Sequence, residues 1–320
     1  MDAVFKSAGE KAMLTFFSIP KPFRGNISRL QRNAIRSWRR LDPKVEILLL
    51  GDDPGVAKMA REVRAIHVPD VDRNRWGTPR VDDIFRKGEQ KASNNLLCYI
   101  NADIILLPGF LDSIHPIFGL AKPFLLIGQR WDLEVKEEID FADSCWDEKI
   151  RDAVHARGVL HSPAGIDYFI FRRGLLPYIP PFGIGRPVWD NWFVLEARRS
   201  GAMVVDATNL VLAIHQTHDY SHHPQGAYGV WAGPEAIENR RLAGRPEYFF
   251  TVEDTTHILT QDGIHLDVRP EKIKRHFSTL MVLWPVSAPL IKSVRWVYKS
   301  AVGMCARVFH RKKKVVEPFP

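Results

Sequence analysis

The chain has 320 residues, of which 45% are hydrophobic and 26% are charged, a composition that supplies ample core for a globular protein. Its net charge of +8 is concentrated at the C-terminus, where residues 271–320 hold 11 Lys/Arg and 2 Asp/Glu. The rest of the chain is close to neutral, which argues against a nucleic-acid groove, so we expect no nucleic-acid partner. No apolar run reaches the roughly 20 residues that a membrane-spanning helix needs.

The cysteines and the N-terminal residues predict the cellular compartment of the protein. Cys98, Cys145 and Cys305 are widely spaced and form no disulfide or zinc pattern, which favours a reducing environment. The first 14 residues include Asp2 and Glu10 and no long apolar core, so they do not resemble a signal peptide. We therefore expect a cytoplasmic protein.

The first 70 residues alternate between apolar, strand-like runs and amphipathic helices. Strands are expected at 14–20, 45–50 and 65–68, with helices at 27–40, capped by Asn26, and at 56–63. This order implies a parallel sheet with right-handed crossovers. No glycine-rich dinucleotide fingerprint follows the first strand, which disfavours a nicotinamide enzyme.

Two features of this region are candidates for nucleotide binding. Asp52 and Asp53 follow the second strand and could accept hydrogen bonds from a nucleobase or ribose, although Asp-Pro-Gly is also a turn signal. Arg80 precedes an amphipathic segment and could pair with a phosphate; a solvated arginine is the alternative.

The run Leu96–Ile100 is predicted to be a central buried strand, and it is followed by Asn101-Ala102-Asp103. Polar groups at the carboxyl end of such a strand lie where open α/β sheets bind ligands. An Asp there can hold a divalent cation, and the cation can hold a diphosphate. The alternative is that Asp103 only caps a turn before Pro108-Gly109.

Further elements are expected downstream. The pattern predicts a helix at 110–118 and another that the stretch 185–192 opens and that runs to Ser200, stopped by Gly201, and it predicts strands at 124–128, 165–171, 204–208 and 210–214. Residues 133–160 and 222–250 show no assignable pattern, and we expect them to shape an acceptor site.

The start of the later helix contains a candidate catalytic carboxylate. Asp190 lies at a loop-to-helix corner between Trp189 and Trp192, and apolar sugar faces pack against aromatic rings. Asp190 could act as a general base. Because the helix dipole alone favours an Asp in the first turn, capping is the alternative.

A histidine cluster follows the last of these predicted strands. Four histidines occur among the nine residues His215–His223, and a neutral imidazole from His215 or His218 could bind a metal. As a zinc motif the cluster is weak, since its spacing is irregular and it has no cysteines. A histidine-rich surface loop is the alternative.

With these residues in place, the chain resembles nucleotide-sugar glycosyltransferases of the GT-A fold, of the bacterial glycosyltransferase-like type. The resemblance covers roughly residues 13–263. It rests on the strand-helix order, on Asn101-Ala102-Asp103 in place of the DxD element, on the Gly-Arg-x-x-Trp-Asp-Asn-Trp corner and on the His-Gln-x-His-Asp-Tyr segment.

The resemblance implies an α/β, Rossmann-like fold with a mostly parallel sheet and flanking helices. It implies that Asp103 coordinates Mn²⁺ or Mg²⁺, that His215 or His218 completes the metal shell, and that Asp190 is the base. A UDP-sugar is the expected donor. The expected donor-site residues are Asp52, Asp53, Arg80, Asn101 and Asp103, and the expected acceptor-site residues are Asp167, Arg186, Trp189 and Trp192.

The implied function is a metal-dependent, inverting, hexosyltransferase-like enzyme that moves a sugar to a glycan or lipid-linked acceptor in surface polysaccharide assembly. Two departures leave room for a weakened or retaining enzyme: Asn101 replaces a carboxylate, and Asn191 follows Asp190 where an acidic pair is usual. A catalytically silent carbohydrate-binding or scaffold protein is one alternative. A sugar nucleotidyltransferase is another, disfavoured because no glycine-rich loop with a following Arg or Lys comes after the first strand.

The pattern changes after residue 270, so we expect a catalytic domain at 1–270 and a tail at 271–320. Apolar residues from Leu290 to Val308 recur on one helical face and basic residues on the other, ending in Arg311-Lys312-Lys313-Lys314. This is typical of a basic amphipathic helix on an anionic membrane. A helix packed on the domain is the alternative. The membrane hypothesis predicts a peripheral protein at the inner face of the cell membrane.

Deletion of residues 289–320 tests this hypothesis. If the basic tail binds the membrane, the full chain should sediment with membranes and the truncated chain should move to the soluble fraction, as measured by fractionation and blotting. Continued sedimentation of the truncated chain would refute membrane binding by the tail.

Overall fold

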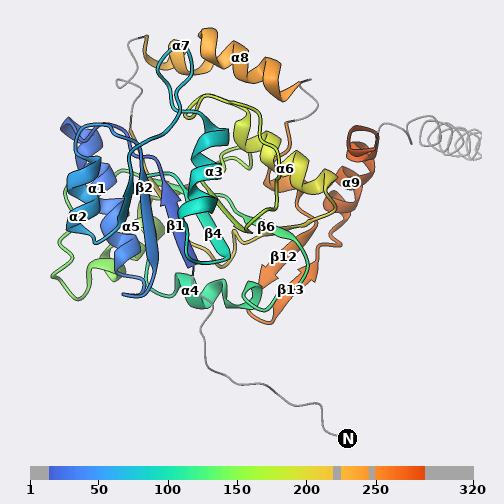
Figure 1. Cartoon of the computed structure of the whole chain (residues 1–320). Coiled ribbons are helices and arrows are strands. Elements are labelled where there is room, and N and C mark those ends of the chain that lie inside the picture. Colours follow the sequence, from blue (N-terminus) through green and yellow to red (C-terminus); the bar gives the residue numbers. More distant parts are fainter. Residues whose placement is uncertain (1–13, 219–224, 245–248, 285–320) are drawn as a thin grey trace, which may run out of the picture. The chain divides into compact units, whose positions relative to one another are not determined.

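A computed structural model of the chain describes residues 14–218, 225–244 and 249–284 (Figure 1). The chain divides into two compact units, residues 1–272 and 273–320. The predicted tail helix and the histidines after His218 in the cluster lie outside the described residues. Within the described ranges, no helix combines the length and the apolar character needed to cross a bilayer.

The first unit is built on a nine-stranded sheet with the strand order β13-β12-β10-β6-β9-β4-β1-β2-β3. The strands are β1 (Leu14–Ser18), β2 (Glu46–Leu50), β3 (Ile66–Val68), β4 (Leu96–Ile100), β6 (Phe124–Ile127), β9 (Tyr168–Arg172), β10 (Met203–Asp206), β12 (His257–Thr260) and β13 (Gly263–Leu266). Pairs β1–β2, β2–β3, β1–β4, β6–β10 and β10–β12 are parallel, whereas β9 and β13 run antiparallel to their neighbours. The predicted mostly parallel α/β sheet is therefore confirmed.

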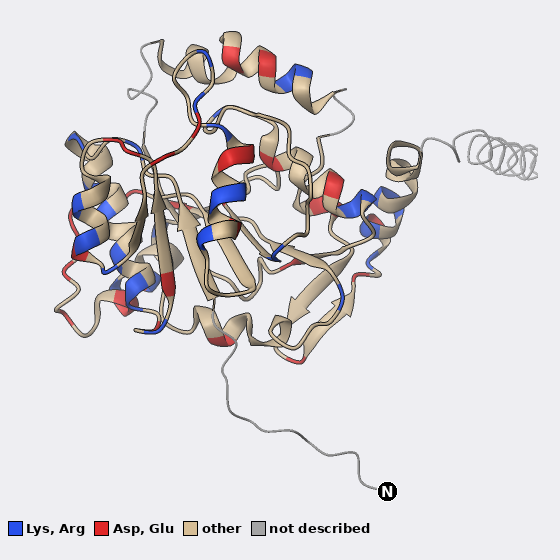
Figure 2. Ribbon diagram, viewed as in Figure 1, with Lys and Arg blue, Asp and Glu red and all other residues tan. Residues whose placement is uncertain are grey.

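Helices connect these strands. They are α1 (Gly25–Arg39), α2 (Val56–Glu62), α3 (Val81–Lys91), α4 (Phe110–Ser113), α5 (Trp146–Arg157), α6 (Trp189–Arg199), α7 (Gly226–Trp231), α8 (Pro234–Ala243) and α9 (Pro270–Leu283), of which the last extends into the second unit. In α3, α5, α6 and α8 the first turn contains acidic residues and the last turn basic ones (Figure 2). This arrangement complements the helix dipole.

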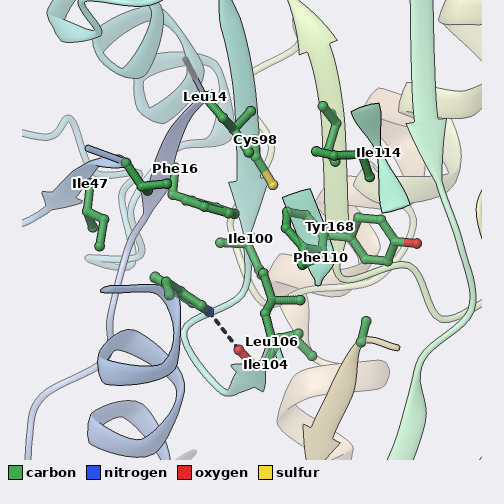
Figure 3. Packing of buried hydrophobic residues seen from close by; sticks show 14 of the residues in the cluster. Leu14, Phe16, Ile47, Cys98, Ile100, Ile104, Leu106, Phe110, Ile114 and Tyr168 are labelled. Atoms are coloured by element: carbon green, nitrogen blue, oxygen red, sulfur yellow. Dashed lines mark hydrogen bonds between the residues drawn. The ribbon is translucent and has the colours of Figure 1, made fainter. Parts of the chain in front are cut away.

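One face of the sheet packs against α1 and α2. Phe16, Cys98 and Ile100 are fully buried there and belong to one apolar cluster (Figure 3). Trp38 of α1 stacks on Phe16 and donates from Nε1 to the carbonyl of Ile104 at 2.8 Å. Because this contact ties α1 to the chain just after Asp103, the core helps to fix the end of the central strand.

The opposite face packs against α3 and α6 through aromatic rings. Alternate residues of the same strands, such as Phe17 and Tyr99, face Phe85 of α3. Trp189 of α6 is 5% exposed and contacts Tyr99 and Phe169. Strand alternation thus gives each side of the sheet its own helix layer.

A second, four-stranded sheet has the order β5-β11-β7-β8. Its strands are β5 (Ile104–Ile105), β7 (Trp131–Leu133), β8 (Val159–Leu160) and β11 (Ile214–Gln216). In its register His215 pairs with Ile104 on one side and with Asp132 on the other. This small sheet therefore joins four chain segments that are far apart in the sequence.

Several predicted boundaries were wrong. Asn26 does not cap α1; it lies inside the helix and accepts a hydrogen bond from Arg29. The predicted helix at 110–118 is a short α4 followed by a 3₁₀ turn at His115–Ile117, and the strand predicted at 210–214 begins only at Ile214. The unassigned residues 133–160 contain α5, whose buried residues are only Trp146 and Val154. So sparse an apolar stripe explains why periodicity did not reveal the helix.

Candidate active site

The site lies where several strands of the sheet end. β4 is followed by Asn101-Ala102-Asp103, and the antiparallel β9 begins at Tyr168, which pairs with Ile100. This register brings Asp167 beside Asn101, whose backbone N–H donates to the carbonyl of Asp167 at 2.9 Å. β6 runs parallel to β10 and ends at Ile127, shortly before Arg130. The carboxyl ends of β4 and β6 thus lie at the edge of the sheet, which is where open α/β sheets bind ligands.

Asp103, His215 and His218 form one cluster. One potential ligand atom from each residue lies within 4.8 Å of the other two. Asp103 Oδ2 is 3.2 Å from His218 Nε2 and 3.9 Å from His215 Nε2. Asp103 Oδ1 is buried and has no hydrogen-bond partner among the described residues. The structure thus brings together the three residues that the sequence nominated as metal ligands.

The backbone of this cluster is fixed by buried polar contacts. The Gln216 side chain is fully buried and donates to the carbonyls of Asp103, at 3.0 Å, and Leu30, at 2.8 Å. Asn33 of α1 donates in turn to Gln216 Oε1 at 3.0 Å. Because these bonds connect α1, β11 and the end of β4, the position of Asp103 is set by the fold itself.

Asp132, which sequence analysis missed, orients one of the histidines. His215 Nδ1 donates to Asp132 Oδ1 at 2.9 Å, which leaves Nε2 of His215 facing Asp103. His161 Nδ1 bonds the other oxygen of Asp132 at 2.6 Å. Burial opposes ionisation of Asp132, but His215, His161 and Arg130 hold its pKa well below the usual range. A carboxylate behind a metal-binding imidazole is the usual outer shell of such sites.

Asp103 itself stays ionised for similar reasons. Burial raises the pKa of its carboxyl group, but the hydrogen bond from His218 and the charges of His215 and Lys21 hold this pKa well below the usual range. Lys21 follows β1, and its backbone is held by Gln31 through two hydrogen bonds. Burial lowers the pKa of Lys21 and the nearby Asp103 raises it, so the two groups support each other's charge.

A divalent cation suits this donor set. The cluster offers one carboxylate and two imidazole nitrogens, a combination used for Mn²⁺ and other first-row metals. The buried Asp103 Oδ1 would otherwise remain without a partner. Asp103, His215 and His218 are therefore the residues that would hold the cation.

A cavity of about 390 Å³ adjoins the cluster. Its wall includes Asp103, His215, His218, Asp190, Asp167 and Asn101, together with the cations Lys21, Arg130 and Arg186. The predicted base, the predicted metal ligands and two of the predicted acceptor residues thus line one space.

Asp190 enters this cavity from the first turn of α6. Val188, just before the helix, has a left-handed backbone with φ of 76°. For a β-branched residue this conformation is unfavourable by about 1–3 kcal/mol, and such conformations cluster at functional sites. Burial raises the pKa of Asp190 to about 7, and Asp167 adds to this, whereas backbone N–H groups and Arg130 oppose it. Burial outweighs the helix N-terminus, which suits a base working near neutral pH.

Asp167 and Asn101 form a pair that explains one departure from the resemblance. Asn101 Nδ2 donates to Asp167 Oδ1 at 2.5 Å, and its Oδ1 accepts from the hydroxyl of Tyr99 at 3.1 Å. The other oxygen of Asp167 accepts from Arg130. A carboxylate at position 101 would face the carboxylate of Asp167 without a proton between them, so an amide fits better here.

Trp189 and Trp192 are not at the cavity wall, contrary to the prediction that they bind the acceptor. Trp189 packs within the aromatic core, and Trp192 is 8% exposed and contacts Phe182 and Phe193. Both rings anchor α6 beneath Asp190. Aromatic residues suit both the buried face of a helix and a sugar-binding surface. The sequence alone therefore could not distinguish these two roles for Trp189 and Trp192.

Asp52, Asp53 and Arg80 lie outside the cavity with Asp103. Arg73 donates to Asp52 at 2.7 Å and lies 3.5 Å from Asp53, which precedes the Gly55 turn. Arg80 pairs with Asp82 and lines a second cavity of about 400 Å³. The structure does not bring these three residues to the metal-ligand cluster, because local ion pairs and a turn hold them elsewhere.

Arg186 and Glu235 separate the two cavities. Arg186 lines the first cavity and donates to Glu235 Oε2 from Nε at 2.9 Å. Asn74, in the wall of the second cavity, donates to the other oxygen of Glu235 at 2.9 Å. Both partners of the ion pair are about nine-tenths buried. α8, which carries Glu235, is thereby fastened to the loop before α6.

No protein-family model matches the chain, and no curated protein matches it. Among solved structures it is similar to glucosyl-3-phosphoglycerate synthase from Mycobacterium tuberculosis in complex with Mn²⁺, UDP and phosphoglyceric acid (14% identity, 65% of this chain, 72% of that chain, TM-score 0.39). It is also similar to TarS 1–349 from S. aureus (10%, 63%, 60%, 0.40) and to a mycobacterial protein (14%, 65%, 68%, 0.43). At these identities and TM-scores the similarities do not support an assignment of function. Function is inferred from the site itself.

Replacing Asn101 with Asp tests the role of its amide. Asn101→Asp puts two carboxylates in contact, and we expect a loss of roughly 1–3 kcal/mol in the free energy of unfolding at pH 8. Like-charge repulsion raises the carboxyl pKa values, so the loss should shrink as the pH falls and one carboxyl group gains a proton. Urea unfolding at pH 8 and pH 5 measures both effects.

The exchanged pair is the matched control. Asn101→Asp combined with Asp167→Asn restores one amide and one carboxylate, and it should recover part of the lost stability. An Asn101→Asp protein as stable as the original at pH 8 would show that the amide is not needed.

Proposed function

We propose that this protein is a metal-dependent glycosyltransferase that uses a nucleotide-sugar donor. The observation that carries the proposal is the coincidence, in one cavity, of the Asp103–His215–His218 cluster and the carboxylate of Asp190. The buried Oδ1 atom of Asp103, which has no hydrogen-bond partner among the described residues, supports a cation at this cluster. A bound divalent cation would neutralise the charge that develops on a leaving diphosphate.

The cationic side chains of the cavity fit the donor. Lys21 and Arg186 line the same cavity as the metal-ligand cluster, and a diphosphate beside the cluster would lie within the electrostatic reach of Lys21 and of Arg186, which is also paired with Glu235. Arg130 is already engaged by Asp167 and Asp132, so its role is to hold those carboxylates in place. We propose a UDP-sugar as the donor.

Asp190 is proposed as the general base. A carboxylate with a pKa near 7 is substantially ionised at neutral pH and still accepts a proton readily. It would remove the proton from an acceptor hydroxyl as that oxygen attacks the anomeric carbon. Attack opposite the leaving diphosphate inverts the configuration. Asp167, held by Asn101 and Arg130, keeps a second negative charge near Asp190 and helps to raise its pKa.

The cellular setting is also part of the proposal. The basic composition of residues 271–320 supports attachment to an anionic membrane surface, at the inner face of the cell membrane. An enzyme held there would suit a glycan or lipid-linked acceptor of surface polysaccharide assembly. These assignments rest on sequence composition.

Asp190→Asn tests the base. With nucleotide-sugars of the UDP, GDP, CDP and dTDP series, Mn²⁺ and a cell-extract glycan acceptor, acceptor-dependent release of nucleoside diphosphate should fall by about 100-fold or more. Because the base must be unprotonated, the original protein's rate should rise with pH through about 7 and then level off. A rate for Asp190→Asn within twofold of the original would refute the assignment.

Stability provides a second readout of the same residue. The folded-state pKa of Asp190 lies above its unfolded value, so its contribution to stability decreases as the pH rises from about 4 to about 7. We therefore expect Asp190→Asn to melt at a higher temperature than the original at pH 8 and at a similar temperature at pH 4. A lower melting temperature at pH 8 would show that the carboxylate is structural.

A further inference from the structure

Two aromatic side chains lie on the short helix α7, beside the candidate active site. Trp231 is 49% exposed and lines the same cavity as Asp103 and Asp190. Tyr228 is 67% exposed and lies three residues earlier on the helix. The intervening Gly229 and Val230 are buried, whereas Ala227, Tyr228 and Trp231 are exposed, so the two large rings lie on the outward part of α7.

The backbone of α7 is attached to α8. Arg240 of α8 donates from Nη2 to the carbonyl of Trp231 at 2.7 Å. α8 is itself tied to the loop before α6 by Glu235, through Arg186, and by Asn239, which donates to the carbonyls of Gly183 and Pro187. The chain segment that carries Asp190 and the segment that carries Trp231 are therefore connected through α8, by buried or partly buried contacts on the side of α6 and by an exposed hydrogen bond to Trp231.

The chemistry of α7 points to one kind of ligand. Its sequence, Gly226 to Trp231, contains no acidic or basic residue, whereas the lining of the cavity includes the cations Lys21 and Arg186. Charged substrate groups would be held by those cations. An exposed indole and phenol offer flat apolar faces with a polar edge, which suit the C–H face and the hydroxyl rim of a neutral sugar.

The spacing of the two rings sets a minimum length for the bound glycan. Residues three apart on a helix have Cβ atoms about 5–6 Å apart, which is comparable with one pyranose unit. A sugar on Trp231 would lie next to the cavity, and the following sugar would reach Tyr228 outside it.

We propose that α7 is the acceptor subsite and that it binds two consecutive neutral sugar units, one on Trp231 and one on Tyr228. The acceptor is then a glycan of at least two units and not a small anionic metabolite. This inference rests on the proposed glycosyltransferase function, because the sugar on Trp231 has to present its hydroxyl to Asp190.

The test measures glycan binding and nucleotide binding separately on the full-length protein. An array of neutral and acidic glycans of one to six units identifies the bound class, and calorimetry with the bound glycans gives affinities for the original protein and its variants. Trp231→Ala should weaken binding by about 10-fold or more, and Trp231→Phe should keep most of it. Tyr228→Ala should reduce the affinity for a two-unit glycan to that for one unit.

Trp76→Ala is the matched control, because Trp76 is 39% exposed but lines the second cavity. Its glycan affinity should equal that of the original. Binding of UDP with Mn²⁺ should be unchanged in all four variants, which shows that the site remains folded. Full glycan affinity in Trp231→Ala, a preference for acidic glycans, or no bound glycan on the array would each overturn the proposal. If the proposed glycosyltransferase function were wrong, the result would be a different one: the original protein would not bind any nucleotide with Mn²⁺.

Discussion

A carboxylate that is largely withdrawn from water and still ionised needs compensating charge, and the Asp103 carboxylate is the group on which the rest of this site depends. Its side chain is 19% exposed, one oxygen faces His218 and His215, and the other has no hydrogen-bond partner among the described residues. Removing water from such a group is costly unless cations or donors replace it. The neighbouring imidazoles and Lys21 supply part of that compensation, and a divalent cation would supply the remainder.

The register of the strands in the small, four-stranded sheet brings these groups together. β5 follows Asp103 directly, β11 contains His215, and β7 contains Asp132, and these strands pair side by side. A shift of one residue in this small sheet would turn the side chains of His215 and Asp132 to the opposite face. The Trp38 and Gln216 hydrogen bonds to the backbone around Asp103 oppose such a shift. The polar site is thus positioned by the core beneath it.

Much of this arrangement could be predicted from sequence. The apolar run of β4 and its position before Asp103 indicated a ligand-binding strand end, and His215 and His218 were nominated because they follow a buried segment. The same rule could have found Asp132, which follows β6 closely. His161 carried no such signal, since it follows β8, a strand of two exposed residues, which itself follows α5, a helix whose apolar pattern is too sparse to recognise.

Other residues that the sequence nominated do not line the cavity, for a common physical reason. Trp189 and Trp192 are core residues, and aromatic residues serve a core and a sugar surface equally well. Asp52 and Asp53 form ion pairs with Arg73, a partner 20 residues away whose position depends on tertiary structure. Periodicity reports which face of an element is apolar, but it does not report which distant element covers that face.

Thermal unfolding with nucleotides tests the central claim, that Asp103 holds a cation which binds a nucleotide diphosphate. UDP, GDP, CDP and dTDP are each added with and without Mn²⁺ to the original protein, to Asp103→Ala and to Asp132→Asn. A ligand that binds the folded state raises the midpoint by mass action.

We predict that one nucleotide raises the midpoint only with Mn²⁺, that Asp103→Ala abolishes this rise, and that Asp132→Asn requires about 10–100 times more Mn²⁺ for the same rise, because His215 loses its orienting carboxylate. Stabilisation that is independent of Mn²⁺, or that survives in Asp103→Ala, would contradict the account.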